Sequence, residues 1–391
     1  MKKLVYALIA AAMILLSGCQ TAGEVQHRIV VHAIGIDGHE KGYEVSYQVF
    51  SGGAPDGAPV DADESTVVTL LTQGRTLFEC EESLRLQTGK EVFLGDAELI
   101  VVSEELKDEK LTEFLQYFRK SDVYLGVNVV YCKGKAKDTI GAKLEQGSAT
   151  AILLRGVVEE AIRNGRAQSA RIIEISNALE RDNEAIAVPI LSLEKDDGSG
   201  KSSGGEEKGS DSSGGGSGKD EGEKSKDEDS TVSDTTIGVF ESQFVTPDGA
   251  GDILDEDAVM GIRLLRADVK TMAIQVEVPQ GIASVEISNI KIKRKMALRD
   301  GIPELRVKIN AIYDIRSFPI GSEDEEIRQA AQRELVALCQ NGAQTLNDGD
   351  ILQIGKMLWK YETRFAENLG GDFSDVIPKT SVSVEVKLEK Y

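Results

Sequence analysis

Apolar positions in the first half of the chain recur with two periods, one typical of strands and one typical of helices. Residues 111–118 carry apolar side chains at the i, i+3, i+4, i+7 spacing of an amphipathic helix. Thr76 and Glu79 form a capping box, which starts a helix that should end near Gly89. Two further helices are expected at residues 149–162 and 169–179. Strands are expected at residues 27–37, 43–50, 97–103 and 127–132.

The same alternation of strands and helices returns after residue 230. Ser322 and Glu325 form a second capping box, and Asp350 should cap a later helix that reaches about Phe365. Residues 380–388 alternate polar and apolar side chains, which predicts a half-buried closing strand. The other strands of this half are expected at residues 259–265, 273–278, 285–291 and 305–315.

Residues 195–230 interrupt this pattern, because all 36 of them are Gly, Ser, Lys, Asp or Glu. Such a segment cannot bury apolar area, so we expect a disordered coil. An interdomain linker is one interpretation. However, residues 185–191 and 235–240 on its two sides both read as strands. Because loop closure costs little more for long loops, we predict an enlarged loop between strands of one domain. Residues 51–63 should form an exposed turn.

These elements predict an α+β fold of three mixed α/β domains, built on small mixed or antiparallel sheets packed by helices. The N-terminal α/β domain should cover residues 27–143. The middle domain should cover residues 144–275 and hold the insertion of residues 195–230. The C-terminal α+β domain should cover residues 276–391.

The first nineteen residues resemble the leader of a bacterial lipoprotein. Lys2 and Lys3 precede a run of 13 uncharged residues, which is too short to span a bilayer. The sequence Leu-Ser-Gly-Cys at residues 16–19 resembles a lipobox, in which the Cys19 thiol receives diacylglycerol and becomes the mature N-terminus. We therefore expect a signal peptide at residues 1–18 and a lipid-anchored tether at residues 19–26. An ordinary signal peptide with a chance cysteine is the alternative.

The charge of the chain narrows the possible partners. The net charge is −21, and removal of Lys2 and Lys3 with the leader would make it −23. A surface this acidic repels phosphate backbones, so we expect no nucleic acid partner. The run at residues 291–299 is an exception, with five basic residues. It fits a solvated strand edge that lysines protect from aggregation, or a contact with an acidic partner or with headgroups.

The residues that usually perform catalysis are scarce. Only Cys80, Cys132 and Cys339 remain beside Cys19, without CxxC spacing, so we expect buried free thiols and neither disulfides nor a zinc site. The three histidines all lie within residues 27–39. Outside the Gly- and Ser-rich segment, the sequence has no nucleophile-elbow or phosphate-loop motif. We predict no catalytic, cofactor-binding or metal-binding residues, and hence a protein that is not an enzyme.

Several short motifs, taken in order after the lipobox, resemble the Ger(x)C family, the C-subunit lipoproteins of bacterial spore germinant receptors. Arg28 and the strand ending Gly35-Ile36-Asp37 resemble the opening strand of that family. Residues 74–80, 99–106 (LIVVSEEL) and 133–140 (KGKAKDTI) resemble three further motifs. Residues 350–355 resemble an Asp-x-x-Gly-x-Gly motif, and Phe365 stands where an aromatic residue is usual. The chain departs from the family pattern at Gln353, Cys80 and Asp96.

The resemblance implies a non-enzymatic subunit of three mixed α/β domains, tethered by Cys19 to the outer face of the spore inner membrane. Its partners would be two multipass membrane subunits of A- and B-type, which would bind the small-molecule germinant. Two other classes of protein remain open. A solute-binding lipoprotein of a transport system would need an aromatic-lined cleft, and aromatic residues make up only 5% of this chain. An envelope hydrolase is disfavoured by the histidine distribution.

Overall fold

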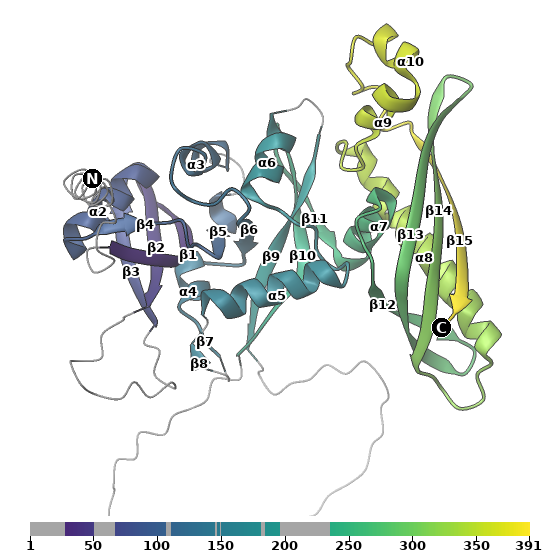
Figure 1. Ribbon diagram of the computed structural model, residues 1–391, viewed down its shortest axis with the longest axis horizontal. Helices are drawn as coiled ribbons and strands as arrows, with labels where there is room; N and C mark the ends of the chain where they lie inside the picture. The colour runs from purple at the N-terminus through teal and green to yellow at the C-terminus, as the bar shows by residue number, and fades with distance from the viewer. Residues whose placement is uncertain are drawn as a thin grey trace, which may run out of the picture.

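The computed structural model describes residues 28–50, 67–106, 111–144, 147–148, 150–180, 184–195 and 235–391. The expected leader, Cys19, the tether, the turn at residues 51–63 and nearly all of the insertion lie outside these ranges. Figure 1 shows an elongated molecule, with a sheet body coloured purple to teal and a C-terminal part coloured green to yellow. None of the described helices is both long and apolar enough to cross a membrane.

One nine-stranded mixed sheet forms the centre of the sheet body. Its order is β11-β10-β9-β6-β5-β1-β2-β3, and β4 pairs with β1. Strands β1, β5, β6 and β9 are parallel neighbours, whereas β2, β3, β10 and β11 extend the sheet by antiparallel pairing. The strands are β1 Arg28–His39, β2 Gly42–Phe50, β3 Val67–Gly74, β4 Glu91–Phe93, β5 Leu99–Ser103, β6 Asn128–Cys132, β9 Ile186–Lys195, β10 Thr235–Thr246 and β11 Gly249–Asp255.

Helices cover both faces of this sheet, so its central strands are buried on both sides. All five residues of β5 are buried, and alternate side chains enter two separate clusters. Ile100 and Val102 pack in the cluster that α2, α3 and α6 close, while Leu99 and Val101 face α4 and α5. These helices are α2 Leu77–Thr88, α3 Leu111–Phe118, α4 Ala136–Ile140, α5 Ala151–Arg163 and α6 Ile172–Leu179. A 3-10 turn, η2 Glu104–Leu106, follows β5, and the short hairpin of β7 Lys143–Leu144 and β8 Gly147–Ser148 precedes α5.

The strands on the two sides of the insertion pair with each other. Strands β9 and β10 are antiparallel, and Lys195 lies opposite Thr235 where the described chain stops and resumes. The prediction that residues 195–230 join strands of one domain is therefore confirmed. The linker interpretation is wrong, because both flanking strands belong to the same sheet.

The C-terminal part is a four-stranded sheet covered on one face by a long helix. The strand order is β12-β13-β14-β15, with β14 and β15 parallel and the other pairs antiparallel. Helix α8 lies behind these strands in Figure 1, and α7 packs against α8 on the side of the sheet body. The elements are α7 Glu256–Arg266, β12 Met272–Val278, β13 Gly281–Arg299, β14 Ile302–Ser317, α8 Asp324–Gln344, η3 Thr345–Asn347, α9 Ile354–Tyr361, α10 Thr363–Asn368 and β15 Ser381–Lys390.

The α+β class, with mixed sheets packed by helices, is confirmed. The first two predicted domains share the nine-stranded sheet, since β6 and β9 pair across residue 143. The boundaries at residues 143 and 275 stay predictions.

Two local predictions were wrong, and one strand was missed. Residues 259–265 form most of α7, because Asp255 caps this segment by accepting a hydrogen bond from the Ala258 N–H, and a buried apolar run suits a helix as well as a strand. The second capping box lies one residue later, where the Glu323 N–H donates to the Glu326 carboxylate. Strand β3 was not predicted, because its side chains are mostly half-buried and give no strong apolar pattern.

Candidate functional site at the Asp350 junction

The three described cysteines are buried free thiols. Cys19 lies outside the described residues. Cys80, Cys132 and Cys339 are free and buried, as predicted, and burial raises the pKa of these thiols to about 11, 12 and 12. Within the described ranges, no group of three or more His, Cys, Asp or Glu side chains could hold a metal ion.

Two of the quoted motifs meet where β1 ends. The carboxylate of Asp37, 1% exposed, accepts hydrogen bonds from the backbone N–H groups of Ala136 (2.7 Å) and Lys137 (3.0 Å) at the start of α4. Burial raises the pKa of Asp37 above its ordinary value, although these N–H donors oppose the shift. Asp37 therefore fastens the strand of the first motif to the helix of the residue 133–140 motif.

The motif at residues 99–106 joins the same cluster from β5. The Ser103 hydroxyl donates to the Gly134 carbonyl oxygen at 2.8 Å, and Glu105 pairs with Lys135 at 2.6 Å. The carboxyl ends of parallel strands are where α/β proteins usually bind ligands. In this chain, the loop before α4 and the Asp37 carboxylate that caps α4 occupy the carboxyl ends of these strands. These motifs therefore hold strands and helix together.

The motif at residues 350–355 lies between the sheet body and the C-terminal part. Asp350 is 3% exposed, and its carboxylate accepts hydrogen bonds from the Ile354 N–H (2.6 Å) and the Gly355 N–H (2.8 Å). Asp350 therefore caps α9, as predicted, although Gln353 and not Asp350 is the residue directly before the helix. A β-bridge joins Asp350 to Glu184 just before β9, and Glu184 pairs with Lys356 at 3.3 Å.

Three arginines complete this junction. Arg263, 6% exposed on α7, donates to the Ile162 and Ala167 carbonyl oxygens of the sheet body and to the Asp268 carboxylate. Arg266 donates to the Ile351 carbonyl oxygen at 2.6 Å, and Arg294 donates to that of Leu352 at 2.5 Å. Burial and the nearby Arg266 lower the pKa of Arg294 to about 10. These side chains tie α7 to both parts of the molecule.

Sequence reasoning missed these arginines. Arg263 lies in the segment read as a strand, and an arginine within an otherwise apolar run was the available signal. Such a residue indicates a buried guanidinium with carbonyl or carboxylate partners. A cavity of about 400 Å³ opens beside the junction, lined among others by Glu184, Arg266, Asp268 and Lys356. None of its twelve described lining residues is aromatic.

Two models of protein families match most of the chain. The family model described as the spore germination protein N-terminal domain matches residues 22–193. A second model, described as spore germination B3/GerAC like, C-terminal, matches residues 248–389. The chain belongs to the GerAC-like family of spore germination proteins. The resemblance stated from the sequence motifs is thereby confirmed.

One solved structure shares the fold of this GerAC-like chain. It is the crystal structure of the GerBC protein, which superimposes with a TM-score of 0.53 at 11% identity. The match covers 91% of this chain and 96% of that one. A comparison with curated proteins finds no match.

The three departures from the GerAC-like pattern have local structural consequences. Gln353 adopts a left-handed conformation, with φ of 60°, where the family motif has a glycine. This left-handed conformation is unfavourable for a residue with a side chain, and glycine, which the resemblance led us to expect there, adopts it without that cost. Cys80 is fully buried in the core, and Asp96 is exposed in the turn before β5.

Asp350 should make the stability of this GerAC-like chain fall as pH rises from about 4 to about 6. Burial raises its pKa to about 6, and Glu184 adds to the shift. The folded state therefore binds more protons than the unfolded state in this window, which lowers the free energy of unfolding by roughly 1.4 kcal/mol per pH unit. Asp350→Asn should remove that component. The measurement is urea unfolding of both proteins at several pH values.

The control for this experiment is Asp348→Asn, which makes the same change at an exposed carboxylate two residues away. It should follow the wild-type pH profile. At each pH, the measured quantity is the unfolding free energy of the wild type minus that of Asp350→Asn. This difference should fall by about 3 kcal/mol as pH rises from about 4 to about 6. A difference that is constant with pH would show that Asp350 does not titrate as described.

Proposed function

We propose that this chain is a non-catalytic, lipid-anchored subunit of a spore germinant receptor. In this proposal Cys19 carries a diacylglyceryl anchor at the outer face of the spore inner membrane. The folded body docks on two multipass membrane subunits of A- and B-type, and those subunits bind the nutrient germinant. The chain acts by contact, transmitting or stabilising the state that the germinant triggers.

The observation that carries this proposal is the pair of spore germination family models that together span most of the chain. The motifs at Asp37 and at residues 350–355 support a mechanical role. Asp37 and Asp350 both have their oxygens committed to backbone N–H groups, so they hold elements in place and are not presented to a substrate. The lipobox at residues 16–19 supports the anchor.

The proposal predicts that two multipass membrane proteins co-purify with this chain from spore membranes. The experiment crosslinks intact spores, extracts the membranes with detergent and isolates the full-length tagged chain. Identification of the crosslinked peptides would also show which face meets which partner. Recovery of the membrane-bound chain without such proteins, from spores that germinate normally, would contradict the docking role.

A solute-binding lipoprotein is the alternative function. The cavity at the Asp350 junction is its best candidate site, and the charges there could bind a polar solute. Its lining lacks the aromatic side chains that such a cleft would need. Thermal stabilisation of the purified protein by an amino acid or a sugar would favour this alternative.

A further inference from the structure

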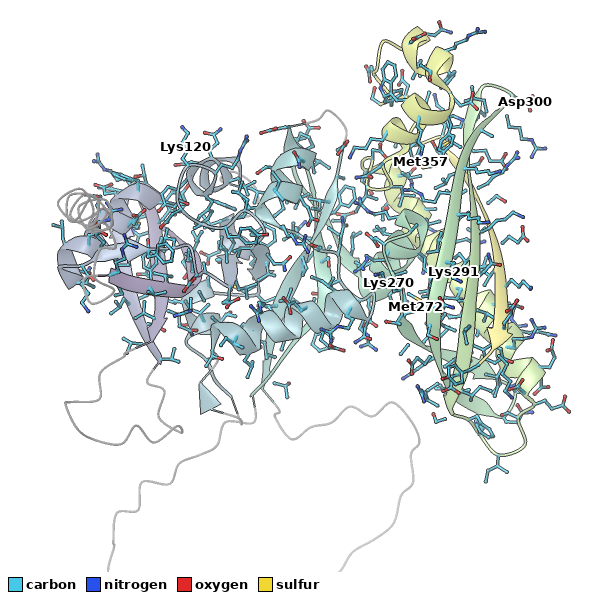
Figure 2. All side chains as sticks on the ribbon, viewed as in Figure 1. Lys120, Lys270, Met272, Lys291, Asp300 and Met357 are labelled. Carbon is cyan, nitrogen blue, oxygen red and sulfur yellow. The ribbon has the colours of Figure 1, made fainter. Side chains whose placement is uncertain are left out.

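The outward face of the C-terminal sheet carries a concentration of positive charge. This basic face comprises the side chains of residues 291–299 of β13, residues 302–310 of β14 and β15 that alternate away from α8, and it has no described helix or strand packed on it. Figure 2 labels Lys291, where the basic stretch of β13 begins, and Asp300, which lies in the turn just after β13 ends. Its basic residues are Lys291, Lys293, Lys295, Arg299, Arg306, Lys308 and Lys387, and its acidic residues are Glu304, Glu385 and Glu389.

The three acids of this face are already committed. Glu304 pairs with Arg306, Glu385 with Lys308, and Glu389 with Lys387. Among the described residues, no salt bridge is formed by the outward basic side chains of β13, which are Lys291, Lys293, Lys295 and Arg299. They are exposed, and they belong to a chain whose net charge is −21.

Like charges also face each other directly across the strands. Lys293 lies opposite Lys308, and Lys295 lies opposite Arg306. Such pairs destabilise a sheet on their own. Lysines that only protect a sheet edge would be needed on β13 alone, because residues 291–299 of β13 have a neighbouring strand on one side only. The basic residues continue onto β14, which has neighbouring strands on both sides. An anionic partner would relieve this repulsion on the β13 side, where the lysines have no salt bridge.

The chemistry of the basic face favours anionic headgroups over an acidic protein. Protein interfaces centre on aromatic and apolar side chains and are depleted in lysine. The outward residues between Lys291 and Asn310 include no aromatic side chain, and lysine is the commonest residue among them. Flexible amines spread over a broad sheet face suit a planar layer of phosphates.

We propose that the basic face of β13 and β14 binds the anionic headgroups of a phospholipid membrane. This contact is independent of the proposed anchor at Cys19. It lies in the C-terminal part, whereas β1, the first described strand after Cys19, belongs to the sheet body at the other end of the molecule (Figure 1). Two points of attachment would fix the orientation of the elongated chain on the bilayer.

The test uses residues 20–391, which retain every described element and lack the leader and Cys19. The measurement is co-sedimentation with vesicles of phosphatidylglycerol and phosphatidylcholine, compared with vesicles of phosphatidylcholine alone. Binding should require phosphatidylglycerol, and it should be lost when salt rises from about 0.1 M to about 0.5 M. The triple variant Lys291→Gln, Lys293→Gln, Lys295→Gln should partition roughly 100-fold more weakly.

The matched control is Lys41→Gln, Lys90→Gln, Lys120→Gln, which removes three exposed lysines from the sheet body and should bind within about twofold of wild type. Equal losses in both triple variants, or binding to phosphatidylcholine alone, would overturn the proposal. Failure to bind vesicles while polyglutamate binds the same lysines would assign the face to an acidic polypeptide. Acylation of lysines in the wild-type chain gives a second readout, in which phosphatidylglycerol vesicles should protect Lys293 but not Lys120.

Discussion

Spores that carry Cys19→Ala should respond to nutrient no faster than spores that lack this chain. In the proposed lipobox, the Cys19 thiol is the group that would accept diacylglycerol, and a single alanine removes it. Two acyl chains give stable attachment, since each buried methylene contributes about 0.8 kcal/mol. Without them, attachment would depend on the proposed basic face alone, whose salt-sensitive contact is weaker than the burial of two acyl chains. The measurement is the loss of optical density after nutrient addition.

The control for the Cys19 experiment is Ser17→Ala, which keeps both the thiol and a small residue before the cleavage site. It should germinate like the wild type. Immunoblots of the membrane and soluble fractions must accompany both strains, because loss of the protein would mimic loss of position. Normal germination by Cys19→Ala spores that retain the protein would contradict the proposed anchoring role.

Capping residues in the sequence correctly predicted where some of the helices begin. The Thr76 hydroxyl accepts a hydrogen bond from the Glu79 N–H at 3.1 Å, as the capping box predicted. The Glu79 carboxylate reaches the Arg75 N–H instead of that of Thr76. Asp350 was correctly identified as a helix cap. Caps of this kind involve atoms only a few residues apart, so a sequence motif contains most of the information.

Features that depend on distant residues could not be read in the same way. Arg263 donates to carbonyl oxygens about a hundred residues earlier in the chain, and Asp37 caps a helix about a hundred residues later. No periodic pattern encodes such pairs. The segment at residues 259–265 was read as a strand for the same reason, because an apolar run records burial but not the partner against which it packs.

Gly261→Ala should be the most destabilising single-methyl change in the described C-terminal part. Helices α7 and α8 cross at Gly261 and Gly342, where a Cβ atom on Gly261 would lie 1.8 Å from the Leu338 carbonyl oxygen and 2.9 Å from the Gly342 N. These are backbone atoms inside a helix, so they cannot rotate away. We expect a loss of about 3 kcal/mol or more in the free energy of unfolding, measured by urea denaturation.

The matched control for that change is Gly156→Ala on α5, where an added Cβ atom meets nothing within 4 Å. It should stabilise the chain by about 0.5–1 kcal/mol, because alanine favours a helix interior over glycine. The opposite signs separate packing from helix propensity. Since α7 carries Arg263 and Arg266, separation of α7 from α8 should also loosen the Asp350 junction. Equal stability of Gly261→Ala and Gly156→Ala would show that the two helices are not in backbone contact.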